Sequence, residues 1–595
     1  MYIKRFVKHY YIMLVPALLW LFFFSIVPMF GIVMAFQDYN PGQGILHSKF
    51  VGLANFKYMF QMSDITQVLR NTVVIALGKI IGNIIFPLVF ALLLNELAFK
   101  KLKRPIQTIV YLPYFLSWVI LAKIVLNIFG YTGPVNQIIG LFGGDAVNFF
   151  GEAKLFQPLV IGTDIWKGFG YNTVVYLAAI LGVDGSLYEA AAVDGCGRFK
   201  RIWHVTLPGI KTTVALLAIL SLGNILNAGF DQIYNLYNPL VYSTGDIIDT
   251  WVYRAGLQNL QYSLATAVGL FKSVISLVLI TVGYWLADKF TGYKLFYEVV
   301  TMIENKSLGS KIFDILNVVI LIAVALICIV PVWYVLCVSL SSREAVNAGQ
   351  VALWPVGFNL LSYKKIMGET AFFGSFLVSI KRVLLGTGIS MVCILMAAFP
   401  LSRTKKQFPK RDIFMWIFVF CMLFNGGTVP WYITMKSYHL MDSIWGLVLG
   451  TGLQVFNVIL AVNFFKNLPP ELEEACYIDG GGPWRNLISI CIPLAKPMVA
   501  TIALFTMVMY WNEFFQGMVL STRQSSYPLQ TYIQQMVVTL DYSTMNVEQI
   551  AQAMKLNNLS LDSAKIFIAM IPVLIVYPFL QRYFVEGITL GSVKG

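Results

Sequence analysis

Charge is scarce in this sequence, and so is histidine. Only 12% of its 595 residues are Asp, Glu, Lys or Arg, whereas 58% are hydrophobic. Because soluble domains carry about 25% charged residues, this composition excludes a soluble globular protein and indicates a polytopic membrane protein. The four histidines form no motif, and the seven cysteines show no C-x-x-C spacing. The sequence therefore predicts no metal site, no disulfide framework and no catalytic residues.

A nucleotide-binding site is also missing from the sequence. The pattern G-x-x-x-x-G-K-[ST] does not occur, since Gly78-Lys79 lacks both the first glycine and the following Ser or Thr. The net charge of +14 does not indicate a nucleic-acid partner, because the basic residues cluster in short segments between apolar runs, as in cytoplasmic loops. We therefore expect no cofactor in this chain and no nucleic-acid partner.

Long apolar segments recur along the whole chain and predict an all-α membrane protein. The first, from Tyr11 to Phe36, would extend roughly 39 Å as a helix, enough to cross a hydrocarbon core of ~30 Å. Proline inside such a segment, as at Pro87, is tolerated in membrane helices. Twelve spans are predicted, six in each half. Their approximate ranges are 11–36, 71–95, 107–130, 157–182, 211–230, 264–288, 312–338, 373–400, 412–430, 443–466, 498–520 and 564–582.

The distribution of basic residues predicts the topology. The short loops 96–106 and 401–411 carry four and five Lys or Arg residues, which is typical of the cytoplasmic side. The predicted outer segments are longer and much less basic. With six spans per half, both halves have the same orientation, so the repeat is parallel and both termini are cytoplasmic. The predicted outer segments are 131–156, 231–263, 341–372 and 521–563.

Two polar stretches between apolar segments are copies of one another. Residues 189–208 read EAAAVDGCGRFKRIWHVTLP and residues 474–493 read EACYIDGGGPWRNLISICIP. They align without a gap, so each residue of the first copy lies the same number of positions before its counterpart in the second. We call residues related by this offset, such as Glu189 and Glu474, equivalent. The glycine after each aspartate can adopt backbone angles that other residues avoid. Each copy therefore predicts a cytoplasmic helix, a tight turn and a second helix, with carboxylates that a basic partner could bind.

The pattern E-A-A, two residues, D-G, then a hydrophobic residue and L-P resembles the signature loop of binding-protein-dependent ABC importer permeases. The second copy departs mildly, with Cys476 for the second alanine and Ile492 for the leucine before proline. The resemblance implies the type I importer fold, with coupling loops at about 184–208 and 469–493. It implies that each loop docks on one of two ABC ATPase subunits, which bind ATP and Mg. The coupling residues implied are Glu189, Ala190, Asp194, Gly195, Glu474, Ala475, Asp479 and Gly480.

The two halves are expected to be separate permease modules joined end to end. Residues 289–311 form a polar connection, and the stretch that begins at Met302, MIENKSLGSK, would serve as an N-terminus. We therefore predict a first module at 1–301 and a second at 302–595. The family resemblance places the protein in a bacterial plasma membrane and adds an extracellular solute-binding protein, lipid-anchored or soluble, as a partner.

Polar side chains within or beside spans are candidates for the transported substrate, since such groups are costly in a membrane. Aromatic rings beside amides and carboxylates suit sugars, and the stretches FDQIYNLYNP, YPLQTYIQQMV and ITLGSVKG resemble permeases for complex oligosaccharides in Gram-positive bacteria. Asn224 and Asn227 are expected on one helix face. Such amides also join helices, at ~0.6 kcal/mol on average. The candidates are Asp164, Trp166, Asn224, Asn227, Asp231, Tyr510, Trp511, Asn512 and Glu513; Lys79, Lys272, Lys381 and Arg382 are interpreted as structural or snorkelling residues.

Three alternatives remain open on the sequence alone. An ion-coupled secondary transporter with twelve helices would share the parallel halves, but the loop NELAFKKLKR lacks the G-x-x-x-D-R-x-G-R-R-like pattern of that family. A membrane enzyme such as a glycosyltransferase would need grouped carboxylates at a membrane face or a metal motif, and neither is found. The same ABC machinery with a non-sugar cargo is the third.

Overall fold

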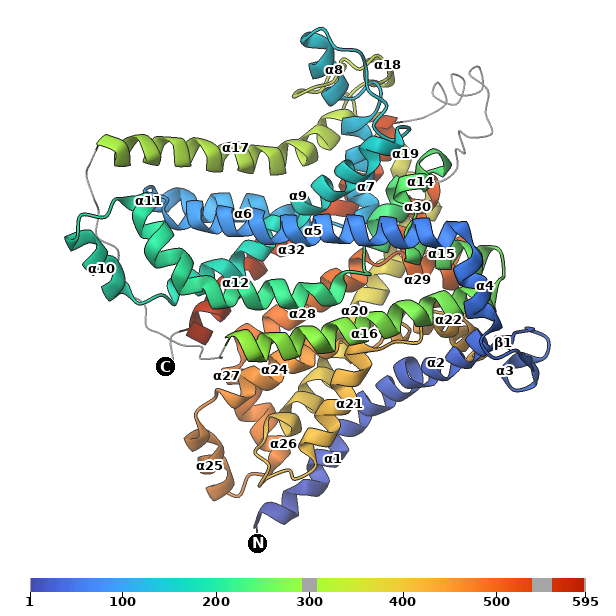
Figure 1. Ribbon diagram of the computed structural model, residues 1–595, viewed down its shortest axis with the longest axis vertical. Helices are drawn as coiled ribbons and strands as arrows, with labels where there is room; N and C mark the ends of the chain where they lie inside the picture. Colours follow the sequence, from blue (N-terminus) through green and yellow to red (C-terminus); the bar gives the residue numbers. More distant parts are fainter. Residues whose placement is uncertain (1, 292–307, 538–558, 593–595) are drawn as a thin grey trace.

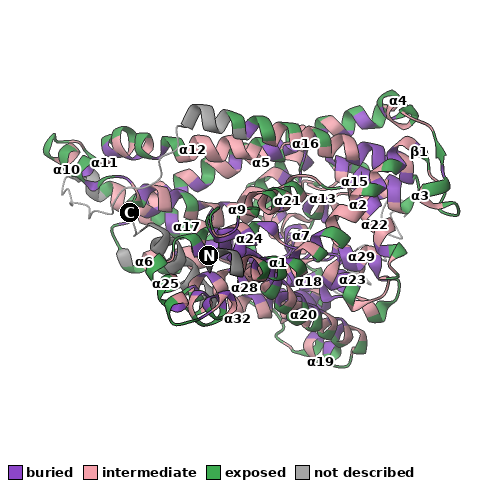
Figure 2. Ribbon diagram, turned by 90° about the horizontal axis from the view of Figure 1, so that it is seen from below, coloured by how far each residue is buried: buried purple, intermediate pink, exposed green. Residues whose placement is uncertain are grey.

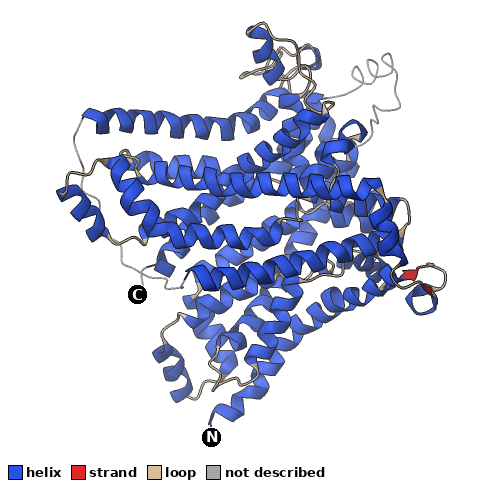
Figure 3. Ribbon diagram, in the orientation of Figure 1, coloured by secondary structure: helices blue, strands red, loops and turns tan. Residues whose placement is uncertain are grey.

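The computed structural model describes residues 2–291, 308–537 and 559–592, and within them the protein is almost entirely helical (Figure 3). Among these residues, one short antiparallel pair of strands, β1 and β2, places Gln37 opposite Phe50. The predicted module boundary at 301/302 lies outside the described residues, as do residues 538–558 of the predicted outer segment 521–563.

The first half of the chain consists of α-helices, short segments of 3-10 or π-helix (labelled η) and the two strands. Its longest helices lie side by side (Figure 1). Its elements are α1 (Tyr2–Leu21), η1 (Phe22–Ile26), α2 (Val27–Phe30), η2 (Gly31–Phe36), β1 (Gln37–Asp38), α3 (Gly44–His47), β2 (Lys49–Phe50), α4 (Ala54–Gln61), α5 (Ser63–Asn95), α6 (Lys100–Phe115), α7 (Trp118–Phe129), α8 (Pro134–Leu141), α9 (Ala153–Leu181), α10 (Gly185–Val193), α11 (Arg198–Arg201), η3 (Ile202–Thr206), α12 (Leu207–Ser221), η4 (Leu222–Asn224), α13 (Phe230–Leu236), η5 (Pro239–Val241), α14 (Tyr242–Gly245), α15 (Ile248–Tyr253), η6 (Arg254–Gln258) and α16 (Tyr262–Thr291).

The second half repeats the main helices of the first. Its elements are α17 (Leu308–Ser339), α18 (Arg343–Asn347), α19 (Leu361–Met367), α20 (Thr370–Ser402), α21 (Arg411–Leu423), α22 (Thr428–Ser437), α23 (Ile444–Leu449), α24 (Val455–Lys466), α25 (Pro470–Ile478), α26 (Pro483–Arg485), η7 (Asn486–Cys491), α27 (Ile492–Leu494), α28 (Lys496–Asn512), α29 (Phe515–Leu520), η8 (Gln524–Ser526), α30 (Leu529–Val537) and α32 (Leu559–Ser592). The helices α5 and α20, the second long helix of each half, both contain 33 residues.

Eight helices among the described residues are long and apolar enough to cross a membrane, or up to eleven if each strongly bent pair counts as one span. The prediction of twelve continuous spans is corrected in five places. The predicted span 107–130 is divided between α6 and α7, 412–430 between α21 and α22, 443–466 between α23 and α24, and 498–520 between α28 and α29. The span 211–230 loses its helix at Asn224, and the chain then turns irregularly before α13.

The two halves share their hydrophobic cores instead of folding as separate bodies. One core joins α1 of the first half to α20, α24 and α28 of the second, with Met13 and Leu14 fully buried there. Another joins α6, α7 and α9 to α17 and α32. Each half therefore sends its first helix into the packing of the other. Figure 2 shows this buried material concentrated where α1, α7, α9 and α24 lie.

The duplicated polar stretches lie on one side of the molecule. In Figures 1 and 2, α10 and α25 lie in the left part of the view, as do the beginning of α1 and the end of α32. The small sheet and the helices α3 and α4 lie at the opposite end. This arrangement agrees with the parallel orientation that the basic loops predicted for the two halves.

Candidate functional site

Each polar repeat folds as a short helix that ends in the same cap. The helices α10 and α25 begin and end at equivalent positions, and both end at the aspartate of the motif. Gly195 and Gly480 follow in the left-handed region, with φ of +73° and +76°. The next amide bonds the carbonyl five residues back, which is a Schellman cap. These bonds are Cys196 N to Ala191 O, 2.9 Å, and Gly481 N to Cys476 O, 2.8 Å.

The outward faces of α10 and α25 match position by position. Val193 is 87% exposed and Ile478, its counterpart, 85%, although isolated apolar side chains of this size gain by burial. The glutamate and alanine of each motif are exposed beside them, and so are Asp194, Gly195, Asp479 and Gly480. The outward faces are defined by Ser186, Leu187, Glu189, Ala190 and Val193 on α10, and by Glu471, Leu472, Glu474, Ala475 and Ile478 on α25.

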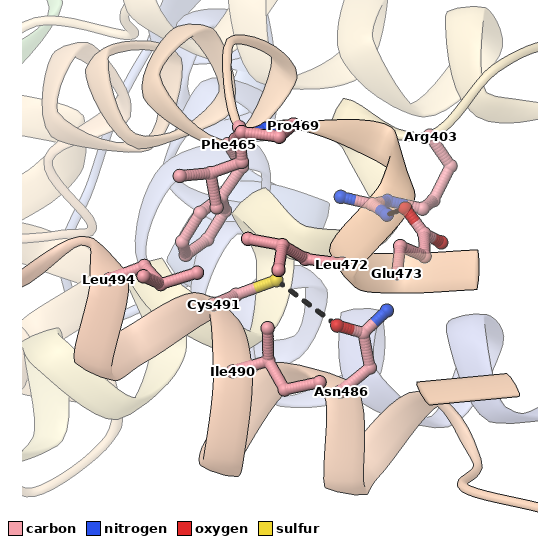
Figure 4. A pocket seen from close by; sticks show the side chains of 10 residues that line it. Arg403, Phe465, Pro469, Leu472, Glu473, Asn486, Ile490, Cys491 and Leu494 are labelled. Carbon is pink, nitrogen blue, oxygen red and sulfur yellow. Dashed lines mark hydrogen bonds and ion pairs between the residues drawn. The ribbon is translucent and has the colours of Figure 1, made fainter. Parts of the chain in front are cut away.

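The inward faces of the two helices differ. On α10, the buried Tyr188 hydroxyl bonds Thr206 Oγ1 at 2.9 Å, and burial raises the pKa of that tyrosine. On α25, Glu473 occupies the position of Tyr188 and forms an ion pair with Arg403 from the loop after α20. Figure 4 shows Arg403 and Glu473 pointing toward one another beside a small cavity behind α25. The anchoring of the two helices has therefore diverged, while their outward faces have not.

The amino ends of the two helices also differ. Asp184 caps α10 by accepting the Ser186 amide at 2.9 Å, and this backbone hydrogen bond lowers the pKa of the Asp184 carboxyl. The corresponding position before α25 is Pro469, which offers no side-chain cap. Of the two helices, α10 alone therefore has a titratable cap at its beginning.

The first helix of each half contacts the polar repeat of the other half. Phe6 on α1 stacks on Tyr477 of α25 with ring centroids 5.1 Å apart, and the Tyr10 hydroxyl is 3.5 Å from that of Tyr477. Asp314 on α17 forms an ion pair with Arg198, the first residue of α11. Both repeats are thus held by side chains from both halves.

A second candidate site lies where the fifth predicted span of each half is interrupted. In the first half, η4 ends at Asn224 and α13 begins at Phe230; in the second, α28 ends at Asn512 and α29 begins at Phe515. Phe230 and Phe515 are equivalent in the sequence and contact each other edge to face, with ring centroids 5.1 Å apart. A contact between equivalent residues lies on the axis that relates two repeats. The two interruptions therefore meet at the centre of the molecule.

Asn224, Asn227 and Asp231 surround the first interruption, and all three are exposed. The expectation that the two asparagines share one helix face is wrong, because the helix ends at Asn224. The backbone N–H of Asn227 then donates to the backbone carbonyl of Asn224 at 2.8 Å, which closes a tight turn. Gln232, next to Asp231, bonds Lys79 at the middle of α5. An exposed carboxylate at that depth is costly in lipid, so we expect these groups to face water.

Three other predicted substrate residues are packed between helices. Tyr510 is 1% exposed and its hydroxyl donates to Val448 O at 3.1 Å. The Trp511 indole donates to Ala569 O at 3.2 Å, and the Trp166 indole donates to Ile327 O on α17 at 3.3 Å. Their hydrogen-bonding groups are occupied by backbone carbonyls in this structure; Tyr510 and Trp511 are buried, whereas Trp166 is half-buried.

The remaining three candidates border the interruptions but already have partners. Asp164 on α9 accepts from Asn83 at 3.1 Å and pairs with Lys79 at 3.3 Å. Asn512 donates to Phe115 O at 2.7 Å, across the two halves. Glu513 pairs with Arg382 at 2.6 Å. Their carboxylates and amide are therefore held in fixed positions around the centre.

Sequence reasoning missed the aromatic cluster that surrounds the two interruptions. Tyr234 stacks near Phe514 with centroids 6.2 Å apart, and Tyr253 meets Phe515 at 5.9 Å. The signal was available, because the offset that relates the polar repeats also relates Phe230 to Phe515. The structural interpretation of Lys79, Lys272 and Arg382 fits the structure, because each forms an ion pair with a carboxylate. Lys272 pairs with Asp249 at 2.6 Å, in addition to the pairs of Lys79 and Arg382 described above.

Comparison with known families places the same fold twice in this chain. The family described as "Binding-protein-dependent transport system inner membrane component" matches residues 87–292 and again residues 371–590. Together these ranges cover more than half of the chain, and each contains one of the polar repeats.

Individual relatives match about half of this chain each. Protein LplB of Bacillus subtilis (strain 168) is 42% identical over 290 residues, 49% of this chain and 91% of that protein. The polygalacturonan/rhamnogalacturonan transport system permease protein YteP of the same organism is 42% identical over 286 residues, 48% of this chain and 88% of its own length. A crystal structure of a bacterial ABC transporter involved in alginate import aligns with 37% identity and a TM-score of 0.45, over 49% of this chain and 98% of that one.

Proposed function

The chain belongs to the family of binding-protein-dependent transport system inner membrane components and carries two permease modules, and on this premise we propose that it imports an oligosaccharide, driven by separate ATPase subunits. The proposal rests chiefly on one observation, the matching outward faces of α10 and α25. Membership of this family removes the secondary-transporter and membrane-enzyme alternatives. The chain is a membrane component of a transporter, and ATP and Mg are bound by its partners.

Two copies of one ATPase surface account for the pattern on the two short helices. Their inward anchoring differs, so the shared outward face is not a by-product of shared packing. It combines exposed apolar side chains with Glu189 and Glu474, which suits a groove that has an apolar floor and a basic residue. Each helix would insert into such a groove on one ATPase subunit, as the family resemblance implies.

An oligosaccharide is the cargo that the central residues suit best. The interruptions bring aromatic rings together with Asn224, Asn227 and Asp231, and sugars offer C–H faces for the rings and hydroxyls for the polar groups. The relative YteP carries a carbohydrate in its name, which supports the same class of cargo here. A sugar would use the rings and the amides together, which supports an oligosaccharide over a cargo that is not a sugar.

The proposal places the protein in a bacterial plasma membrane, with α10, α25 and both termini in the cytoplasm. A solute-binding protein, lipid-anchored or soluble, would deliver the cargo at the opposite side, where the small sheet and α4 lie. Closure of the two ATPases would bring α10 and α25 together. The two cores, each of which includes the first helix of the other module, would then rotate about the central contact and expose the interruptions to one side at a time.

ATPase activity in proteoliposomes tests the proposal. The protein is reconstituted with its candidate ATPase and binding protein, and hydrolysis is measured with and without cargo. Cargo-loaded binding protein should stimulate hydrolysis of the wild type. The double variant Glu189→Arg and Glu474→Arg should lose this stimulation, because each reversed charge would face the basic residue expected in the ATPase groove.

A matched control uses charges in the same loops but outside the two helices. Lys200 and Arg485 are exposed, basic and equivalent, so Lys200→Glu with Arg485→Glu reverses two charges in the same repeat. This control should keep its stimulation. Carbohydrate transport without any ATPase, or full stimulation of the Glu189→Arg and Glu474→Arg variant, would contradict the proposal.

A further inference from the structure

Each interrupted span is tied to the rest of its module by one buried cation. Lys79 on α5 donates to Ala228 O at 2.7 Å, and Arg382 on α20 donates to Glu513 O at 3.1 Å. Ala228 and Glu513 are equivalent positions, related by the same offset as the polar repeats. A broken helix leaves carbonyls without partners, and such a group costs several kcal/mol at membrane depth. The two cations satisfy that requirement at the same position in both modules.

Each cation also holds the element that follows the break and the neighbouring span. Lys79 donates to Gln232 Oε1 on α13, and Arg382 donates to Gln516 Oε1 on α29 at 2.6 Å. Lys79 pairs with Asp164 on α9, and Arg382 donates to Leu447 O on α23 at 3.0 Å. Three segments that are distant in the sequence are thereby joined at one charged group in each module.

The two ties are built from different residues at different heights. Lys79 is the seventeenth residue of α5, whereas Arg382 is the thirteenth of α20, about one helical turn away. The balancing carboxylate comes from α9 in the first module and from the interruption itself, at Glu513, in the second. The arrangement therefore persists although its residues have changed, which indicates that the position of the interruption is what the cations preserve.

We propose that Lys79 and Arg382 are positioning residues for the cargo: each fixes the interruption of the fifth span of its own module, so that the polar groups there meet the cargo in one geometry. This inference rests on the proposed function. Asn227 directly precedes the carbonyl that Lys79 holds, and Asp231 directly precedes Gln232. Glu513 carries both the held carbonyl and the paired carboxylate. Neither cation needs to touch the cargo itself.

Hydrogen exchange tests the positioning without any need for transport. Lys79→Met should speed exchange of the amides in 225–231, and Arg382→Met should speed exchange in 513–517, each by about tenfold, the effect of one lost hydrogen bond to a charged group. The other module should not change. Lys272→Met is the matched control, because it also removes a cation paired with one aspartate, and the hydrogen bonds of Lys272 go to Asp249 on α15 and not to a carbonyl of an interruption. If Lys79→Met does not fold, Lys79→Met with Asp164→Asn leaves no unpaired carboxylate and replaces it.

Transport kinetics test the consequence for the cargo. The two methionine variants should raise the KM for cargo-loaded binding protein about tenfold while ATP hydrolysis without cargo stays at the wild-type rate, and Lys79→Arg and Arg382→Lys should recover part of the loss. A purely structural role would lower the maximal rate and the basal hydrolysis together. Unchanged exchange at both interruptions in folded variants, or an equal KM effect of Lys272→Met, overturns the inference. Absence of carbohydrate transport by the wild type would instead refute the proposed function.

Discussion

Alanine at the two left-handed glycines should loosen the ends of α10 and α25. A Cβ at Gly195 or Gly480 would meet no atom within 4 Å, so crowding contributes nothing. The backbone is the whole cost, because both residues have positive φ, and a non-glycine residue there loses about 1–2 kcal/mol. A change of that size multiplies the population of the opened cap by about 5–30. The amides of the last turn of each helix should exchange faster by this factor.

The same loops provide a control for this experiment. Gly197 and Gly482 are also equivalent, their φ values are −68° and −99°, and an added Cβ again meets nothing. Alanine there avoids the left-handed penalty, and the gain of about 0.4–1 kcal/mol from restricting the unfolded chain is offset by the loss of glycine at the N-cap of α11 or α26, so the net effect should be small. Exchange is measured by mass spectrometry on the reconstituted protein, in peptides that cover α10 and α25. Equal rates in all four variants would refute the role assigned to the left-handed cap.

Three further outcomes are expected. Because the pKa of Asp184 is lowered, its cap is intact above the ordinary value of 3.8 and is lost as the pH falls through the lowered one; hydrogen exchange should therefore show α10 fraying in acid, and Asp184→Asn, which caps without titrating, should remove this part of the pH dependence. Gly170→Ala should lower the unfolding temperature strongly, since its Cβ would lie 2.3 Å from a backbone oxygen, whereas Gly162→Ala, with nothing within 4 Å, should not. In thermal unfolding, Arg403→Met should destabilise by about 1.5–3 kcal/mol, because it removes a charged hydrogen bond to Glu473, which keeps the Tyr477 hydroxyl as a donor, and adding Glu473→Met should recover part of that loss.

The short helices α10 and α25 and the turns that end them could be predicted from the sequence because their determinants are local. A glycine after the aspartate, an apolar position on each outward turn and proline at the end all act within one short stretch of chain. The duplication then doubled the signal, and basic loops oriented both copies. The structure adds that the outward faces agree while Tyr188 and Glu473, at equivalent inward positions, have different partners. Only that contrast separates a docking surface from a packing surface.

The interruptions could not be predicted, because their determinants are distant in the chain. Residues 211–230 read as one apolar span, and the group that stabilises the break is Lys79, whose bond to Ala228 crosses 149 positions of sequence. The direction in which side chains point could not be predicted from the sequence either. Tyr510 and Trp511 stand next to Asn512 and Glu513, but the first two point into the packing between helices. Adjacency of rings and polar groups in a sequence does not say that they share a surface.

The exchange of first helices bears on why the two modules differ from one another. Tyr477 on α25 contacts Phe6 and Tyr10 of α1, whereas Arg198, which follows α10, pairs with Asp314 of α17. These contacts are unlike: one is aromatic, the other ionic. In a pair of identical modules, the loop at α10 would meet α1 where it now meets α17, or the loop at α25 would meet α17 where it now meets α1. A pair of unlike modules supplies one helix of each kind, so the loops at α10 and α25 each contact the first helix of the other module.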